Sequence, residues 1–253
     1  MSSLRESIRG GKSKRTDFPL VLSKAALLII DVQRYCCGKV TTEYYQKDAL
    51  PKMTSNIQIL TELFRLQRDT AKPKGEPDAL VPNTCGCEVI FVMIQSKTND
   101  GRDLSIDYKL SGPNFAGCPT VNCSYADIFL PSIMPSTDGR GDIVVSKTAC
   151  SVFNSTNIDY LLRNLFVEQL VVVGQLTDQC VESAVRDAAD LGYLVTVVED
   201  ACATHTKERH EKGLQGMQGF CRILTTLELV KEVQKLDLAD GAPATPSESQ
   251  SRS

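Results

Sequence analysis

The chain has 253 residues, of which 42% are hydrophobic and 23% are charged, so it is long enough to form one substantial core. Its formal net charge of −3 provides no sustained basic face for a phosphate backbone, and we expect no nucleic-acid partner. No apolar run reaches the roughly 18 residues that a membrane span requires, so we expect no membrane partner and a small-molecule substrate instead.

The first segment, residues 1–19, is basic but lacks the apolar stretch of a secretory signal. Its Ser and Arg content is that of a transit peptide, but Glu6 and Asp17 argue against one. We therefore predict a flexible N-terminal arm and a cytoplasmic protein, with unconventional secretion left open. In that compartment the ten cysteines are expected to be reduced.

Short apolar runs then alternate with segments of helical periodicity. The predicted strands are residues 25–31, 89–94, 143–145, 170–173, 194–198 and 222–225. The predicted helices are residues 57–68, 156–166, 179–191 and 207–219. This βαβ alternation predicts an α/β fold, a doubly wound parallel sheet with right-handed crossovers.

Two irregular insertions, residues 69–87 and 99–141, interrupt the alternation and are rich in Pro, Gly, Asn and Asp. Long loops in a compact domain are usually functional or mobile. Residues 239–253 lack the apolar content needed to fold, which predicts a disordered tail after a single domain of residues 20–238.

Three reactive residues lie at or just beyond the carboxyl ends of predicted strands, where open parallel sheets bind ligands: Asp31, Lys147 and Cys180. Taken singly, the aspartate is most simply a cap, the lysine a solvent-exposed charge and the cysteine a core residue. Together they supply what nucleophilic catalysis needs. Cys180 would be the nucleophile, with its thiolate favoured by a helix N-terminus and by Lys147, while Asp31 accepts the thiol proton. We accordingly expect Cys180 to be the only rapidly alkylated thiol whose modification affects function.

Three blocks that carry these residues occur in order: "LLIIDVQ", "VVSKTACSVFNST" and "VVVGQLTDQCVESAVRDAADLGYLVTVVEDACAT". They resemble the isochorismatase-like superfamily of cysteine hydrolases, over about residues 20–230. The resemblance implies an Asp-Lys-Cys catalytic triad at Asp31, Lys147 and Cys180. It also implies a six-stranded parallel sheet with helices on both faces, and a homo-oligomer, either a dimer or a tetramer.

The same resemblance implies further site residues. Gln33 matches a position near the site, and Phe153 matches an aromatic residue that walls the substrate pocket. A non-proline cis peptide bond is implied at Gln175–Leu176, and the backbone N–H groups of Leu176 and Cys180 would form the oxyanion hole.

A metal site is not expected. Nicotinamidases of this superfamily hold a metal through Asp and His residues after the second strand, but "VMIQSKTNDGRDLSIDYK" contains no histidine. His205 and His210 belong to a later helix, and His210 is expected at the surface.

A cluster of Cys85, Cys87, Cys118 and Cys123 is the alternative metal site, but its spacing fits no standard zinc finger. We predict neither a metal nor another cofactor.

The loop "DGRDLSIDYKLSG" resembles that of the ureidoacrylate and carbamoyl amidohydrolase branch, and that of isochorismatase-like proteins of plant pathogens. Arg102, Tyr108 and Lys109 are candidates to bind a substrate carboxylate, and a solvated charged loop is the equal alternative.

Three functions stay open. The first is a cysteine amidohydrolase acting on a small amide, ureido or carbamoyl acid. The second is an isochorismatase that cleaves a vinyl ether to pyruvate and a dihydrodiol. The third is a non-catalytic binding protein on the same fold. Cys180 favours the first, because covalent C–N hydrolysis needs a nucleophile.

Overall fold

The computed structural model describes residues 17–70, 87–110, 117–138 and 141–240. Most of the predicted N-terminal arm, of the first insertion and of the tail lies outside the described residues, and so does Cys85. The predicted tail begins within the last described helix, which runs to Asp240.

Six strands form one sheet, in which every neighbouring pair is parallel and the order is β3-β2-β1-β4-β5-β6. The strands are β1 (Ala25–Ile30), β2 (Glu88–Ile94), β3 (Ile143–Lys147), β4 (Gln169–Gln175), β5 (Leu194–Ala203) and β6 (Cys221–Leu224). The predicted six-stranded parallel sheet is confirmed. β5 is longer than predicted, because Cys202 and Ala203, beyond the predicted end at Val198, still pair with Gly174 and Gln175 of β4.

The central strands are buried on both faces, as their continuous apolar runs predict. All six residues of β1 are buried, and alternate side chains enter different cores. Leu27 and Ile29 face one core, whereas Leu28 and Ile30 face the other. Burial of each such side chain contributes roughly 1.5–3 kcal/mol, so the strand is held by both helical layers.

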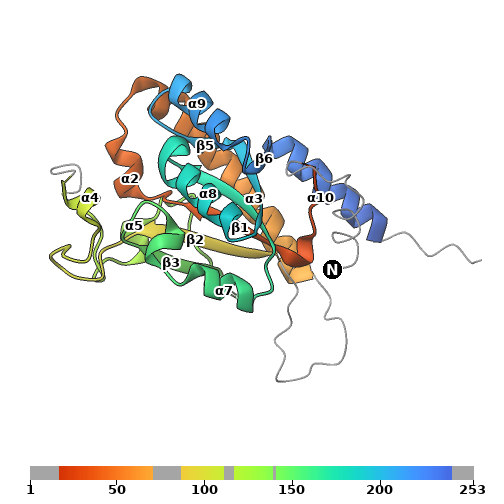
Figure 1. Ribbon diagram of the computed structural model, residues 1–253, viewed down its shortest axis with the longest axis horizontal. Helices are drawn as coiled ribbons and strands as arrows, with labels where there is room; N and C mark the ends of the chain where they lie inside the picture. Colours follow the sequence, from red (N-terminus) through yellow and green to blue (C-terminus); the bar gives the residue numbers. More distant parts are fainter. Residues whose placement is uncertain (1–16, 71–86, 111–116, 139–140, 241–253) are drawn as a thin grey trace, which may run out of the picture.

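Helices cover both faces of the sheet. One layer contains α3 (Leu50–Thr70) and α10 (Thr226–Asp240), and the other contains α7 (Ile158–Asn164), α8 (Glu182–Asp190) and α9 (Lys207–Met217). Figure 1 shows α7 and α8 on the near side of the sheet and α3 on the far side. Among the described helices, none is both long and apolar enough to cross a membrane.

The helices differ from the predictions in two ways. α3 begins earlier than the predicted residues 57–68, because Pro51 is compatible with a first helical turn and the preceding π-helical turn η2 (Tyr45–Ala49) leads directly into it. α10 is absent from the predicted helices, although its Leu229 and Val233 pack in the core.

Shorter elements gather at one end of the sheet. They are α2 (Arg34–Lys39), α4 (Ile106–Leu110), α5 (Tyr125–Ile128) and α6 (Val152–Ser155). α2 follows β1, while α4 and α5 belong to the second insertion, and all three lie together on the left of Figure 1. The predicted loop 99–141 thus places structured segments beside the carboxyl ends of the strands.

The strand order reverses between β1 and β4, since the chain runs outward through β2 and β3 before returning beside β1. Ligands of doubly wound sheets bind at this switch point, beyond the carboxyl ends of the strands. Asp31 follows β1 here, and the segment after β4 carries Cys180. The fold therefore brings the two residues to the same crevice.

Candidate active site

Asp31 occupies a constrained position at the end of β1. Its backbone φ is 54°, in the left-handed region that Asp tolerates better than most residues. Its N–H donates to the Val92 carbonyl at 3.0 Å, and its own carbonyl accepts from the Gln175 side chain at 2.8 Å. The carboxylate is buried, at 2% exposure, and is therefore aimed into the protein rather than capping a surface turn.

Lys147, at the end of β3, is the fully buried cation of the site. Its Nζ lies 2.9 Å from Asp31 Oδ2 and 3.3 Å from Cys180 Sγ. It also donates to the carbonyls of Ala149 at 3.0 Å and Cys150 at 2.8 Å. Burial alone would lower the pKa of Lys147, but Asp31 and Cys180 outweigh it and hold that pKa above its ordinary value. The ammonium is therefore charged and fixed between the carboxylate and the sulfur.

Cys180 lies in the π-helical turn η4 (Thr177–Val181), which leads directly into α8. The carbonyl of Leu176 accepts hydrogen bonds from the N–H groups of Gln179 and Val181, which flank Cys180 in the sequence. The Gln175–Leu176 peptide bond that begins this turn is cis. The Cys180 side chain is 7% exposed and contacts the second core.

A second thiol lies beside the first. Cys150 Sγ is 3.8 Å from Cys180 Sγ and 3.4 Å from Ser183 Oγ. The hydrogen bond with Cys180 lowers the pKa of Cys150 to about 6, despite partial burial. The same hydrogen bond, together with burial, raises the pKa of Cys180, and Lys147 opposes that rise. The lowered pKa is therefore that of Cys150, whereas the pKa of Cys180 is raised.

Burial raises the pKa of Asp31 well above its ordinary value, although Lys147 acts in the opposite direction. Asp31 Oδ1 is buried, and the carboxyl group interacts with the Cys180 thiol. A carboxylate with a raised pKa is a stronger base, so this oxygen is suited to take a proton from a thiol and later return it.

A second layer of hydrogen bonds holds this cluster. The amide of Gln175 donates to the Asp31 carbonyl and to Cys37 Sγ at 3.1 Å, and accepts from the hydroxyl of Tyr45. On the other side of η4, Thr177 Oγ1 lies 2.8 Å from Nδ1 of His210. These bonds fix the backbone on either side of the cis peptide and of Cys180.

A match to the isochorismatase domain covers residues 25–228, which include every strand of the sheet. The chain belongs to the isochorismatase family. Within this family, a ureidoacrylate amidohydrolase of Agrobacterium fabrum is 49% identical to it over 61 residues, which are 24% of this chain and 27% of that protein. The alignment thus spans about a quarter of that relative's length.

Two other similarities cover more of the chain. An Arabidopsis thaliana protein named "probable inactive nicotinamidase" is 24% identical over 196 residues, 77% of this chain and 88% of that one. A cysteine hydrolase structure from Pseudomonas syringae pv. phaseolicola superposes with a TM-score of 0.67 at 20% identity, covering 88% of this chain and 98% of that one. The fold is therefore that of an isochorismatase-family hydrolase.

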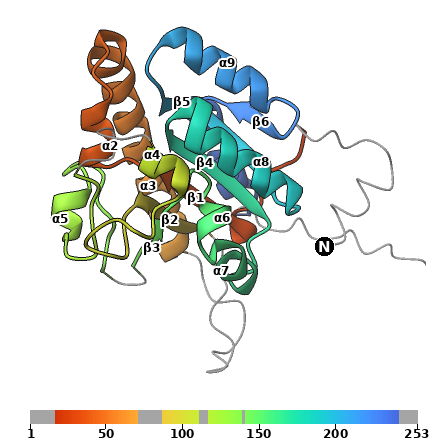
Figure 2. The same cartoon turned by 60° about the vertical axis from the view of Figure 1, so that its left-hand side comes forward.

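Among the expected substrate-binding residues, Tyr108 lies at the site. Its hydroxyl is 3.8 Å from Cys180 Sγ, and the residue is 6% exposed. Figure 2, which brings the left side of Figure 1 forward, shows its helix α4 in front of the sheet. Tyr108 therefore covers the sulfur.

Arg102 and Lys109 lie on the outside of the same segment. Arg102 pairs with Asp100 at 3.2 Å, and both side chains are exposed. The exposed Lys109 donates to the carbonyl of Arg102. Neither cation has a hydrogen bond or ion pair with the buried cluster in the described structure, and their role in carboxylate binding stays a prediction.

Gln33 and Phe153 also have structural contacts. Gln33 is fully buried, donates to the Ile94 carbonyl at 3.0 Å and accepts from its N–H at 2.7 Å. Its amide therefore joins the ends of β1 and β2. Phe153 is half-buried against the core that contains Cys180, with its ring centroid 6.1 Å from that of Tyr193.

The metal alternatives find no support in the described residues. No group of three or more His, Cys, Asp or Glu side chains lies close enough there to hold a metal ion. Cys85 lies outside those residues, so the four-cysteine cluster stays untested. His210 is half-buried and bonded to Thr177, rather than lying free at the surface as predicted.

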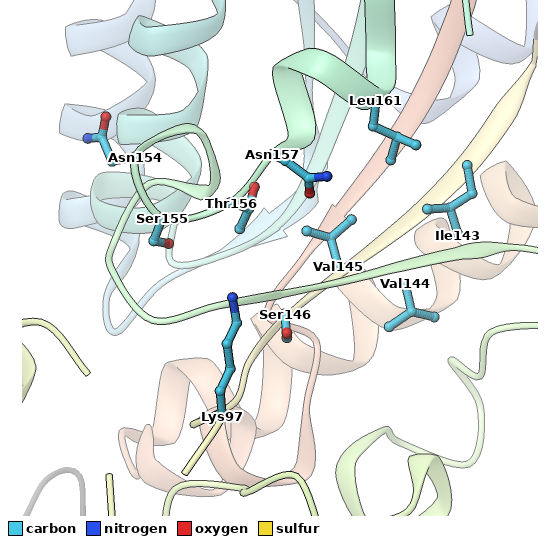
Figure 3. Close-up of a pocket in the computed structure, with 10 residues that line it drawn as sticks. All are labelled: Lys97, Ile143, Val144, Val145, Ser146, Asn154, Ser155, Thr156, Asn157 and Leu161. Carbon is cyan, nitrogen blue, oxygen red and sulfur yellow. The ribbon is translucent and has the colours of Figure 1, made fainter. Parts of the chain in front are cut away.

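An open cavity of about 780 Å³ lies between the edge strand β3 and residues 154–157. Figure 3 shows Val145, Asn157 and Lys97 among its lining side chains. None of the residues that line it is Asp31, Lys147 or Cys180. The cavity is thus separate from the buried cluster.

Sequence reasoning does not assign a role to Cys150 or Gln175. Cys150 follows Lys147 by three residues and therefore lies at the same strand-end rim, which is a usable signal. The role of Gln175 depends on the side-chain contacts with Asp31, Cys37 and Tyr45, which no local pattern reveals.

Proposed function

We propose that this isochorismatase-family protein is a cysteine hydrolase that cleaves a C–N bond in a small amide, ureido or carbamoyl acid. The observation that carries the proposal is the position of Lys147, whose Nζ contacts both Asp31 Oδ2 and Cys180 Sγ. A buried ammonium between a carboxylate and a thiol couples the charge of one to that of the other. These three residues are the proposed triad.

The first step is proton transfer from Cys180 to Asp31. The hydrogen bond with Cys150, together with burial, raises the pKa of Cys180, so the resting sulfur holds its proton until a substrate arrives. Burial also raises the pKa of Asp31, which makes its carboxylate a better acceptor. Lys147 stabilises the negative charge on either side chain, because its Nζ contacts both Asp31 and Cys180.

The thiolate then attacks the substrate carbonyl carbon, and a tetrahedral oxyanion forms. The N–H groups of Leu176 and Cys180 are the proposed oxyanion hole. Supporting this, the Leu176 carbonyl bonds to the N–H groups on either side of Cys180, at Gln179 and Val181. Collapse of the oxyanion breaks the C–N bond, Asp31 gives its proton to the leaving nitrogen, and water then cleaves the thioester.

The similarity to a ureidoacrylate amidohydrolase supports a ureido or related amide as the substrate, but over a quarter of that protein only. One relative is named "probable inactive nicotinamidase", so family membership alone is no support for turnover. Release of product must therefore be measured directly.

One observation favours a second candidate, hydrolysis of the vinyl ether of isochorismate. A carboxyl group whose pKa is raised by burial can hold a proton, and Asp31 could donate it to the enol ether carbon before water adds. This reaction does not need a covalent bond to Cys180.

The test is a substrate panel in which ammonia and pyruvate are measured in parallel, with wild type, Cys180→Ala and Asp31→Asn. We expect ammonia from an amide, ureido or carbamoyl acid, and none after Cys180→Ala. Pyruvate release from isochorismate that survives Cys180→Ala but not Asp31→Asn, with no amide turned over by the wild type, would replace the proposal with the second candidate.

A further inference from the structure

Cys150 has no role in the proposed hydrolysis, yet its sulfur lies 3.8 Å from the Cys180 sulfur. The backbone of Cys150 is fixed through its carbonyl, which accepts from Lys147 Nζ at 2.8 Å. Its side chain also contacts Ser183 Oγ, in the first turn of α8 beyond Cys180. Two elements thus hold the second thiol against the first.

We propose that Cys150 and Cys180 are a reversible oxidation site for hydroperoxides, and that oxidation joins them in a disulfide. A disulfide requires the sulfurs to approach to about 2.05 Å. Cys150 lies in the segment between β3 and α6, outside any helix or strand, so rotation of its side chain can supply much of this movement. It is also the more exposed of the two cysteines, which gives a small peroxide a route to the pair.

The reaction balances with hydrogen peroxide as the only oxidant, and an alkyl hydroperoxide would give one alcohol and one water in the same two steps. The sulfur of Cys180 attacks the peroxide, the O–O bond breaks, and Cys180 becomes a sulfenic acid while water leaves. Cys150 sulfur then attacks Cys180 sulfur, the S–O bond breaks, and the hydroxide that leaves becomes a second water by taking a proton from the Cys150 thiol or, where Cys150 is already a thiolate, from solvent. Two thiols are oxidised by two electrons, and one peroxide is reduced to two waters.

The charge on the pair supports this chemistry, since the thiolate is the reactive form of cysteine. The pKa of Cys150 is lowered to about 6 by its hydrogen bond with Cys180. This lowered pKa favours a thiolate within the pair at neutral pH. The anion and the remaining proton lie within one hydrogen bond, so either sulfur can begin the reaction.

The consequence differs from that of oxidising a solitary thiol. A disulfide blocks the proposed nucleophile but is reversed by a dithiol, whereas a sulfenic acid with no neighbouring thiol proceeds to sulfinic and sulfonic acids. Cys150 would therefore protect Cys180 from irreversible oxidation.

The experiment treats the full chain with hydrogen peroxide, blocks the remaining thiols with N-ethylmaleimide, and maps the peptides by mass spectrometry. In the wild type we expect a cross-linked Cys150–Cys180 peptide that has lost two hydrogens, and recovery of both thiols after dithiothreitol. In Cys150→Ser we expect Cys180 to gain two or three oxygens, with no recovery. Cys36→Ser is the matched control, because Cys36 is another half-buried cysteine at this end of the sheet, and it should behave as the wild type.

Three results would overturn the proposal: Cys180 bearing two or three oxygens while Cys150 stays free in the wild type, Cys180 left unoxidised, or a cross-link from Cys180 to Cys36. Circular dichroism checks that Cys150→Ser is folded, and Cys150→Ala replaces it where it is not. The readout is a peptide mass and requires no substrate. Failure of this proposal is therefore distinguishable from failure of the proposed hydrolysis.

Discussion

The Nζ of Lys147 lies 2.9 Å from Oδ2 of Asp31, and the two side chains are 0% and 2% exposed. Removing one partner of a buried ion pair leaves the other charge without compensation, which costs about 3–5 kcal/mol. We therefore expect Lys147→Met to lower the free energy of unfolding by about that amount and to abolish turnover. Denaturant titration, together with the substrate assay, measures both effects.

The double variant Lys147→Met with Asp31→Asn is the control for this pair. It removes both charges, so most of the lost stability should return while turnover stays absent. A double variant as unstable as Lys147→Met alone would show that the loss comes from packing rather than from an unpaired carboxylate.

The Cys150–Cys180 pair predicts an unusual pH dependence of alkylation. Because the pKa of Cys150 is about 6, iodoacetamide should modify it at half its maximal rate near pH 6. Cys180→Ala removes the hydrogen bond that lowers this pKa, so the midpoint should move to higher pH. Thiolate below its pKa falls roughly tenfold for each pH unit, so alkylation near pH 6 should slow by about tenfold or more. Peptide mapping of the labelled thiol gives the rates.

Cys221→Ala is the matched control for this shift, since Cys221 is a buried cysteine on the far edge strand β6. Its loss should leave the Cys150 midpoint unchanged. An unchanged midpoint in Cys180→Ala as well would contradict the hydrogen-bonded thiol pair.

The alkylation prediction also shows where sequence reasoning ends. The positions of Asp31, Lys147 and Cys180 at strand ends follow from the βαβ pattern, because parallel strands meet at one edge. The βαβ pattern cannot show that Cys180 is buried or that it contacts Cys150. This burial and this contact decide which of the two thiols has the lower pKa. The expectation for Cys180 therefore stays a prediction, and the contact adds Cys150 as a second thiol that we expect to be alkylated rapidly.

The same limit applies to the substrate-binding residues. Arg102, Tyr108 and Lys109 share one charged loop, but only the fold decides which of them faces inward. On α4, Tyr108 is buried while the adjacent Lys109 is exposed, as expected when a short helix lies on a surface. To predict which side chain is buried, one must know where α4 lies relative to the sheet, and its five residues alone do not indicate that.

Tyr108 predicts how access to the sulfur is controlled. Its ring is buried, and its hydroxyl lies 3.8 Å from Cys180 Sγ. Tyr108→Ala should expose the sulfur and raise the alkylation rate of Cys180 several-fold, whereas Tyr108→Phe keeps the ring and should change that rate little. Lys109→Ala, at the neighbouring exposed position, is the control and should match the wild type. Equal rates in all four proteins would show that Tyr108 does not cover Cys180.

The last prediction concerns the close approach of β4 to β1 beside Asp31. Gly174 has φ of +114°, and a Cβ placed there would lie 2.1 Å from the Ile30 carbonyl oxygen. The position of the added Cβ and that of the Ile30 oxygen are both set by the backbone, so Gly174→Ala must push the two strands apart. We expect this to lower the free energy of unfolding by more than about 3 kcal/mol. The shift would also displace Asp31 from Lys147, and turnover should fall with stability.

Gly192→Ala is the matched control, because Gly192 has φ of +95° but no atom within 4 Å of the added Cβ. It should cost only the backbone strain, about 1–2 kcal/mol. Equal losses of stability in the two variants, measured by denaturant titration, would show that backbone conformation rather than the contact with Ile30 requires the glycine.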